Sequence, residues 1–568
     1  MKRLALLMFT TLMFVIGVSA QTITVSCVGS AAMDTAAIQS AINSIGTGTG
    51  TITLPRDNDP RCVVNDLIVP SNITMDFGLN SAGVQIVTSK ILSIGSLIAR
   101  PDQQLFFNAL AGQGTVNLSV SVLHPEWWTA NVNPGVTDMT AAINAAIQAC
   151  PHRRAARLQI LGGYLLSGSG TELILVDRNV SLVGVGAQSS RLIPSTSVGS
   201  STRVIRVVPD GDTRFLSIAD LSIQPPSGTG PAGYGIDLDV SGFGSLANLS
   251  VEHCYFERLG SSAIHLTNPA ARVDGFFSSD IRNNFIVGSI DLVGCGDSIK
   301  VRDNIITGAQ AGIGITFGGL AATGKSIIDG NSITTAGGAI NVLSGDKLVI
   351  SNNNIEQVFT YTGTLDALIN LEGSAAARIL HANITNNTIN SLGRVVNLVR
   401  INYADRTVLQ DNDLQKSPGP SVVITENARN TDPRAQAWGD PYEVSIADSG
   451  VGTYNVSQQL TLASGWVNNG FPVDAASSTK TSDNRVHLHG LIITDLSPPS
   501  LGFSLTTLPV GHRPADTVYC PVFATSNGKV VTGSIHITAG GVIVLDSGPT
   551  AFHDGIVLEI PPFKASDP

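Results

Sequence analysis

The chain has 568 residues and a formal net charge of -10 at pH 7, and only 13% of its residues are charged. An acidic chain argues against nucleic acid and anionic membrane surfaces as partners. Its 58 glycines and its many Asn, Ser, Thr, Val and Ile residues favour strands and turns over helices.

The first residues have the pattern of a secretory signal peptide. Lys2 and Arg3 precede an apolar run, and small residues lead up to Ala20. This pattern predicts a signal peptide over residues 1–20, cleaved after Ala20, and a protein secreted to the extracellular space or the cell surface. No later apolar run is long enough to span a bilayer, so we expect no membrane span.

Two short helices are expected in the first third of the chain. MDTAAIQSAI (33–42) places Ile38 and Ile42 four residues apart, and DMTAAINAAI (138–147) does the same with Ile143 and Ile147. Apolar residues at this spacing share one face of a helix. The strand-like GTITLP follows the first helix, and we expect an N-terminal β-rich cap region over residues 21–123.

Six cysteines are too few for a disulfide scaffold, and their spacing does not resemble a zinc site. Export permits disulfides, and Cys27 with Cys62 is the most local candidate pair.

Two short patterns recur through the middle of the chain. The first is apolar-x-x-Asn-x-apolar, with its asparagine at Asn284, Asn304, Asn331, Asn353, Asn387 and Asn412, and with Cys254 in the same place in VEHCYF. The second is apolar-x-apolar, as in IDL (236–238), IHL (264–266) and IDL (290–292). From Ile236 to Val422 there are 186 residues over seven intervals, a mean period near 27.

Short strands and polar turns at a fixed period indicate a solenoid, and no helical pattern separates the strands. The fold class is therefore all-β, a parallel β-helix with apolar side chains stacked inside. An asparagine at one turn of every coil would stack into an internal ladder, so we interpret these asparagines as architecture.

The stretch HPEWWTANVNPGVTDMTAAINAAI (124–147), with Asp138 and Thr140, resembles the entry segment of the pectate-lyase-like superfamily of right-handed β-helices, which includes phage tailspikes. NVSLVGVGAQSSRLI (179–193) resembles the coil that follows. The resemblance implies a right-handed β-helix over residues 124–435 with a short N-terminal capping helix. It also implies a homotrimer.

After Pro433 the repeat fades. GWVNNG and LPVGHRPADTVYCPV, within residues 465–522, resemble C-terminal β-sandwich modules of phage tail fibres. We therefore expect a separate antiparallel β-sandwich over residues 455–568.

The candidate site comes from the middle residue of the second pattern, which should face outward. Aligned coil by coil, this column reads Asp237, His265, Asp291, Gly314, Asn341, Asn370, Asn397 and Val423. Adjacent parallel strands lie about 4.8 Å apart, so Asp237 and Asp291 would be roughly 10 Å apart with His265 between them. Carboxylates at about this separation perform acid–base work in inverting glycosidases, and we take these three residues as the candidate catalytic centre. The alternative is the polar outer face of an ordinary strand.

Further residues are candidates for binding a glycan or a metal ion. Asn341, Asn370 and Asn397, with Glu372 beside Asn370, would form a polar strip that suits an extended sugar chain, and Tyr234 could stack on a sugar face. Within the resemblance, pectate lyases hold calcium with aspartates, and Asp237 and Asp239 could do so here.

Two functions remain open on these residues. The first is a secreted polysaccharide lyase or glycoside hydrolase that acts on an extended, acidic glycan. The second is a non-catalytic, tailspike-like adhesin or surface fibre that binds glycans. The Asp237, His265 and Asp291 column favours the first, and the absence of the superfamily's ordered polygalacturonase signatures favours the second.

Overall fold

The computed structural model contains two compact units, residues 1–160 and 161–568, which we describe separately. The described residues are 21–56, 60–168, 170–209, 211–226, 233–242, 244–257, 259–269, 272, 275–309, 313–319, 325–335, 337–357, 365, 367–391, 397–415, 421–433, 437–438, 446–448, 457–468, 475–481, 484–494, 501–526, 529–548 and 555–566. The predicted signal peptide lies outside them. Neither α-helix within these ranges is long and apolar enough to cross a membrane.

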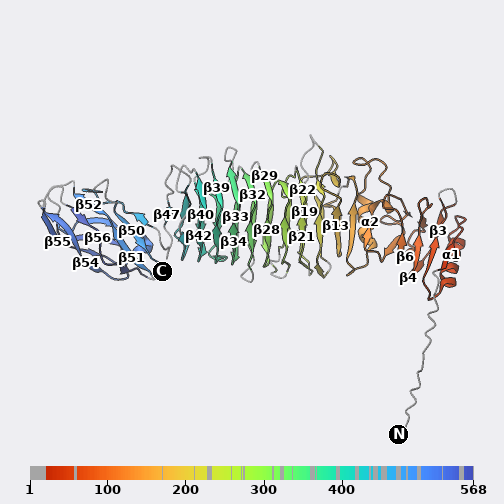
Figure 1. Ribbon diagram of the computed structural model, residues 1–568, viewed down its shortest axis with the longest axis horizontal. Helices are drawn as coiled ribbons and strands as arrows, with labels where there is room; N and C mark the ends of the chain where they lie inside the picture. Colours follow the sequence, from red (N-terminus) through yellow and green to blue (C-terminus); the bar gives the residue numbers. More distant parts are fainter. Residues whose placement is uncertain are drawn as a thin grey trace, which may run out of the picture. The chain divides into compact units, whose positions relative to one another are not determined.

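The first unit is built from parallel strands (Figure 1). Its larger sheet contains β1 (Gln21–Thr24), β2 (Gly50–Thr53), β4 (Leu67–Asp76), β6 (Ile91–Ile98) and β8 (Thr115–Leu118). A smaller sheet contains β3 (Cys62–Val64), β5 (Val84–Ile86) and β7 (Phe106–Phe107), and β9 (Val122–Leu123) pairs with β10 (Ala156–Ile160).

Both predicted helices are present in this unit. They are α1 (Ala31–Ile45) and α2 (Thr140–Ala149), and Ile38, Ile42, Ile143 and Ile147 are all buried. Before α2, the short 3-10 helix η1 (Pro125–Trp127) buries Trp127 among its neighbours. The predicted disulfide between Cys27 and Cys62 is also present, with the two Cα atoms 5.0 Å apart.

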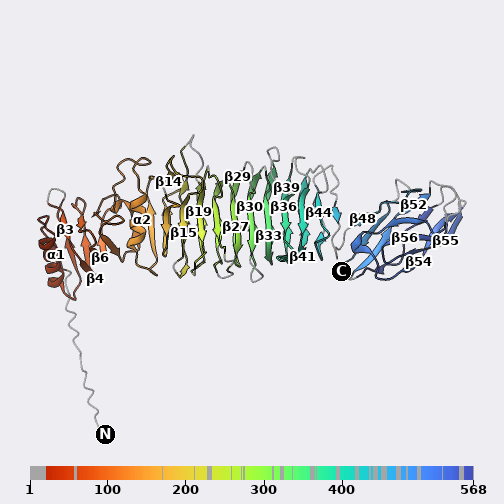
Figure 2. The ribbon, with the colours of Figure 1, turned by 180° about the vertical axis from the view of Figure 1, so that it is seen from behind.

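The second unit contains a right-handed parallel β-helix of three long sheets, whose successive strands lie side by side in both views (Figures 1 and 2). The first sheet contains β13 (Val180–Gly184), β17 (Ser217–Ala219), β21 (Ser250–Glu252), β25 (Asp280–Arg282), β28 (Lys300–Arg302), β31 (Ile327–Asp329), β34 (Val349–Ser351), β38 (Asn383–Thr385), β42 (Val408–Gln410) and β45 (Asp432–Pro433). The second contains β11 (Gly163–Leu166), β14 (Arg191–Pro194), β18 (Ser222–Ile223), β22 (Tyr255–Phe256), β26 (Phe285–Val287), β29 (Ile305–Ala309), β32 (Ser332–Thr335), β35 (Asn354–Gln357), β39 (Thr388–Asn390), β43 (Asp413–Gln415) and β46 (Ala437–Trp438).

The third sheet carries the candidate site. Its strands are β12 (Glu172–Val176), β15 (Arg203–Val207), β19 (Tyr234–Asp239), β23 (Ile264–Thr267), β27 (Ile290–Cys295), β30 (Ile315–Gly319), β33 (Ile340–Asp346), β36 (Ala367–Glu372), β40 (Asn397–Asn402), β44 (Val422–Ile424) and β47 (Ile446–Asp448). Smaller parallel groups are β16 (Asp212–Arg214), β20 (Ser245–Ala247) and β24 (Phe276–Phe277), and β37 (Ile379–Leu380) with β41 (Ala404–Asp405).

Apolar side chains from successive coils stack in columns inside the β-helix. In the first sheet one fully buried column, in strand-to-strand register, contains Ile218, Val251, Ile281, Val301, Ile328, Ile350, Ile384 and Leu409. This pattern fits a strand that buries alternate residues in a core.

The predicted asparagine ladder runs along the turn between the first and second sheets. The side-chain nitrogen and the backbone nitrogen of Asn304 both donate to Oδ1 of Asn331, at 3.0 and 3.1 Å. The same two bonds connect every consecutive pair from Asn284 to Asn412. Cys254 donates its backbone N–H to Asn284 and so begins the ladder, as its place in the pattern predicts.

We expect Asn331→Ala to lower the free energy of unfolding of the β-helix by about 2 kcal/mol or more. The change removes an acceptor used by two buried donors of Asn304, and it removes the amide that donates to Val301 and Asn353. Urea unfolding followed by circular dichroism measures the loss. Asn354→Ala is the control, because Asn354 is exposed on the next strand and should change stability by less than about 0.5 kcal/mol. Equal costs for the two variants would contradict the role of the ladder.

The last part of the second unit is an antiparallel β-sandwich, as predicted. One sheet contains β48 (Ser457–Gln459), β50 (Ser477–Lys480), β51 (Arg485–His489) and β58 (Phe563–Lys564). The other contains β49 (Trp466–Asn468), β52 (Leu491–Thr494), β57 (Gly555–Val557), β54 (Val518–Ser526), β55 (Lys529–Ile537), β56 (Val542–Ser547) and β53 (Ser504–Thr507). The 3-10 helix η2 (Val510–His512) lies between β53 and β54 in the chain. Buried residues from both sheets, from Leu460 to Ala565, form one hydrophobic core.

Candidate functional site

The three candidate catalytic residues lie on adjacent strands of the third sheet. Asp237 on β19 is in register with His265 on β23, which is in register with Asp291 on β27. The coil-by-coil alignment of these residues is therefore confirmed. The two carboxylates are two strands apart, about 10 Å at the usual strand spacing.

Asp237 is fully buried, so the expectation that it lies on an exposed strand face is wrong. Its partners lie on the outer side of the sheet and cover it. Nδ1 of His265 lies 2.8 Å from Asp237 Oδ1, and the Thr267 hydroxyl donates to the same oxygen at 2.8 Å. Arg203 Nε lies 2.5 Å from Oδ2, but neither atom has a hydrogen bond, so this contact is an ion pair without hydrogen-bond geometry.

His265 is held in one orientation by these contacts. A carboxylate only accepts hydrogen bonds, so Nδ1 is the donor to Asp237, and Nε2 is the ring nitrogen left for a ligand. The Tyr234 ring lies against the imidazole, with the ring centroids 4.5 Å apart. The His265 side chain is 22% exposed, and no described residue forms a hydrogen bond with Nε2. Nε2 is therefore the ring nitrogen that a ligand can reach.

Asp291 has the electrostatics of a proton donor. It is half-buried, and Oδ1 has no hydrogen-bond partner among the described residues. Burial raises the pKa of the Asp291 carboxyl above its ordinary value, and the neighbouring His265 and a backbone hydrogen bond from Val293 lower it by smaller amounts. The carboxyl consequently keeps its proton to higher pH than an exposed aspartate.

Asp239 belongs to a different set of contacts. Arg206 donates to Asp239 Oδ2 at 2.6 and 3.0 Å, and Ser241 N–H donates to Oδ1. Burial raises the pKa of Asp239, but the hydrogen bonds from Ser241 and Arg206 outweigh it and the pKa is lowered. Because Asp237 and Asp239 are each bound by an arginine, they do not form an open pair of carboxylates for calcium. Among the described residues, three or more His, Cys, Asp or Glu side chains nowhere gather as a metal site would require.

Two positions of the predicted column are wrong. Asp291 is in register with Thr316 rather than Gly314, and Asn370 is in register with Arg400 rather than Asn397. Asn397 pairs with Ala367 at the start of its strand and is buried. In these coils the residue in register lies two or three residues after the middle of the apolar-x-apolar match, so the sequence pattern selected the wrong residue.

The side chains of the predicted binding strip are largely engaged in hydrogen bonds with one another and with neighbouring residues of the same sheet. Asn370 donates to Oδ1 of Asn341 at 2.9 Å, and both side chains are buried. Glu372 accepts from Arg400 and, at 2.6 Å, from Asn402. Arg203, Arg206 and Thr267 were not predicted, although the charged residues within the apolar RVIRV (203–207) are a signal that could have pointed to the first two.

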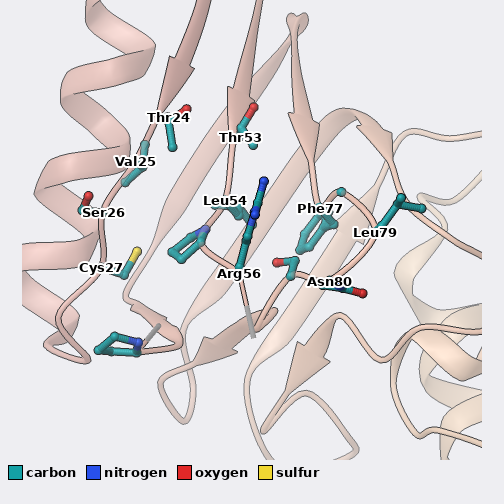
Figure 3. Close-up of a pocket in the computed structure, with 14 residues that line it drawn as sticks. Thr24, Val25, Ser26, Cys27, Thr53, Leu54, Arg56, Phe77, Leu79 and Asn80 are labelled. Atoms are coloured by element: carbon teal, nitrogen blue, oxygen red, sulfur yellow. The ribbon is translucent and has the colours of Figure 1, made fainter. Parts of the chain in front are cut away.

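A separate pocket of about 650 Å³ lies in the first unit, beyond the carboxyl ends of β1, β2 and β4 (Figure 3). Arg56 stands between Leu54 and Phe77 in it, and Asn80 lies on the side away from α1. It contains none of the predicted site residues.

The chain matches no family model and no curated protein. Solved structures with similar folds include ORF18 of Geobacillus virus E2 (12% identity, 75% of this chain and 76% of that chain, TM-score 0.34). A tailspike protein mutant of E. coli bacteriophage HK620 has 12% identity, covers 76% of this chain and 89% of its own, and has a TM-score of 0.40. The Azotobacter vinelandii mannuronan C-5 epimerase AlgE4 A-module has 15% identity, coverages of 57% and 88%, and a TM-score of 0.32. What these proteins share with this chain is the parallel β-helix.

Proposed function

We propose that this protein is a secreted glycan-degrading enzyme in which His265 is the general base and Asp291 the general acid. The observation that carries this proposal is the row Asp237–His265–Asp291. A buried carboxylate fixes one ring nitrogen of a histidine, and a carboxyl with a raised pKa lies on the next strand. A carboxyl with a raised pKa beside an oriented histidine is typical of acid–base sites.

Each residue has a separate part in this chemistry. His265 Nε2 takes a proton either from an attacking water or from a carbon of the sugar ring, and Asp291 gives its proton to the glycosidic oxygen that leaves. Asp237 is a positioning residue, because it contacts His265 and Arg203 and is itself inaccessible. Thr267 and Arg203 keep its carboxylate in place.

The substrate is an extended polysaccharide. The outer column continues from Asp291 through Thr316, Asn341, Asn370 and Arg400. Its partly exposed members, Thr316 and Arg400, offer a hydroxyl and a guanidinium group along the sheet. Arg203, Arg206 and Arg400 are each bound by a carboxylate, so these charges do not by themselves select an acidic glycan. Secretion rests on the pattern of residues 1–20.

A non-catalytic, glycan-binding surface fibre is the second candidate. It is favoured by the contacts of Glu372 with Arg400 and Asn402, which fix a partly exposed polar group remote in sequence from the proposed acid and base. Such a protein would bind an oligosaccharide and leave it intact.

The test is incubation of the mature protein with a panel of acidic and neutral polysaccharides. Absorbance near 235 nm reports the unsaturated products of elimination, and new reducing ends without that absorbance report hydrolysis. We expect products from at least one polysaccharide, and we expect their formation to stop in His265→Gln while binding in affinity electrophoresis is retained. Retarded migration without any product, in the wild type, would overturn the enzyme and support the fibre.

A further inference from the structure

A second cavity of the first unit, of about 540 Å³, lies at the amino ends of β3, β5 and β7. These strands are parallel and in register, so their amino ends meet at one edge of the small sheet. Arg61 precedes β3, Ala82 precedes β5 and Gln104 precedes β7, and all three residues line the cavity. Its volume lies within the range of roughly 300–1,000 Å³ that is usual for small-molecule sites.

The guanidinium group of Arg61 is held in this cavity from two sides. Its Nε donates to the backbone oxygen of Ala82 at 2.8 Å, and its central carbon Cζ lies 3.3 Å from the centre of the Phe107 ring. A cation and an aromatic ring attract each other at this distance. The terminal nitrogens Nη1 and Nη2 have no hydrogen-bond partner among the described residues. The group is therefore fixed in place, and its two terminal nitrogens remain for a ligand.

The charge of Arg61 has no compensating carboxylate in the part of the chain that the structure describes. Arg61 is the only charged residue among the described residues that line the cavity. Burial lowers the pKa of Arg61 below its ordinary value, since its charge is partly removed from water. In the same unit Arg100 is paired with Asp102 at 2.7 Å. A partly buried cation without an anion is unfavourable, so a bound anion would be stabilised beside Arg61.

Gln104 adds a hydrogen-bond acceptor to the same cavity. Its amide nitrogen donates to the backbone oxygen of Trp128 at 2.8 Å, and this bond fixes the orientation of the amide. No described residue donates to the amide oxygen Oε1. A guanidinium pairs with a carboxylate through two parallel hydrogen bonds, and an amide oxygen accepts from a hydroxyl. Arg61 and Gln104 together match a ligand that carries a carboxylate and a hydroxyl group.

We propose that this cavity binds a sugar acid, with the carboxylate on Arg61 and a hydroxyl group on Gln104. The sugar acid is either a free monosaccharide or the end residue of a glycan, because both present the same groups. The cavity requires no group from the row of Asp237, His265 and Asp291, so the proposal stands whether or not the protein is an enzyme. It gives the first unit a binding role of its own.

Isothermal titration calorimetry on the full mature chain tests the ligand. Glucuronate and galacturonate are the probes, at low ionic strength, where charge pairs are screened least. We expect at least one of them to bind at millimolar concentration or below. Glucose and galactose, which have no carboxylate, and acetate, which has no hydroxyl group, should bind at least about tenfold more weakly. A short oligomer of the bound sugar acid distinguishes the two sources: tighter binding than the monomer assigns the cavity to a glycan end, and no binding assigns it to the free sugar acid.

Variants of Arg61 test the site. Arg61→Gln should weaken binding of the sugar acid at least about tenfold, because it removes a charge-assisted pair of hydrogen bonds. Arg61→Lys keeps the charge but has no planar fork, and it should lose part of the affinity. Arg100→Gln is the matched control in the same unit and should bind as the wild type does. His265→Gln should also keep the full affinity, which separates this cavity from the proposed catalytic row.

Four outcomes would overturn the proposal. The first is a wild type that binds neither sugar acid at millimolar concentration. The second is binding of glucose, galactose or acetate as tight as that of the sugar acid. The third is full affinity in the folded Arg61 variants, and the fourth is a loss in Arg100→Gln as large as that in Arg61→Gln. Circular dichroism melting identifies the folded variants. If Arg61→Gln does not fold, Arg61→Lys and the comparison of ligands on the wild type decide the question.

Discussion

Asp291→Asn is expected to lower turnover on the true substrate by about two to four orders of magnitude, the usual contribution of a general acid. An asparagine has nearly the same shape but has no carboxyl proton to transfer. Since Asp291 is half-buried without a hydrogen bond to Oδ1, the loss should appear in the rate and not in the fold. Initial rates with the glycan identified by the panel measure it.

The dependence of the rate on pH tests the role of Asp291 in a second way. A general acid must be protonated, so the wild-type rate should fall as the pH rises through the pKa of Asp291, which lies above the ordinary carboxyl value. This limb should be absent from the profile of Asp291→Asn. Asp239→Asn is the control, because Asp239 is bound by Arg206 and Ser241 outside the row, and its turnover should change by far less. If Asp291→Asn keeps its full rate and the same profile, Asp291 is not the acid.

The largest effect on stability is expected for Asp237→Leu, at about 3 to 5 kcal/mol. This is the typical cost of removing one member of a buried ion pair, and it leaves the Arg203 cation and the His265 and Thr267 donors without their acceptor. Urea unfolding of the variant and the wild type measures the difference.

A double variant separates the charge from the packing. Asp237→Leu combined with Arg203→Met removes both charges, so it should recover part of the loss. Asp280→Leu is the comparison on the first sheet, where the ion pair with Arg302 is partly exposed and should cost no more than about 1 kcal/mol. A cost for Asp237→Leu as small as that of Asp280→Leu would contradict a structural role for the buried pair.

The fold could be predicted because its signal repeats. Each coil from Asn284 to Asn387 contributes an asparagine with the same two hydrogen bonds to the next coil, so the recurring apolar-x-x-Asn-x-apolar pattern identifies a ladder. Alternation between buried and outward residues then placed Asp237, His265 and Asp291 in one row correctly.

The site was harder to predict because it depends on coils whose strands do not begin at a fixed distance from the asparagine. This is why Gly314 and Asn397 were assigned to places that Thr316 and Arg400 occupy. The burial of Asp237 was missed for a related reason. Arg203 lies in an earlier coil, before the repeated pattern starts. It is in register with Tyr234, and its long side chain reaches the Asp237 carboxylate three residues further along β19.

The asparagine ladder also holds successive coils in the same register although the coils differ in length. Consecutive ladder residues are 20 residues apart between Asn284 and Asn304 but 34 apart between Asn353 and Asn387, and the hydrogen bonds at the ladder are nevertheless the same. Lengthening a connection between sheets costs only a slowly growing closure entropy. The β-helix can therefore accept insertions and deletions in its loops one coil at a time, so new surfaces can evolve beside an unchanged frame.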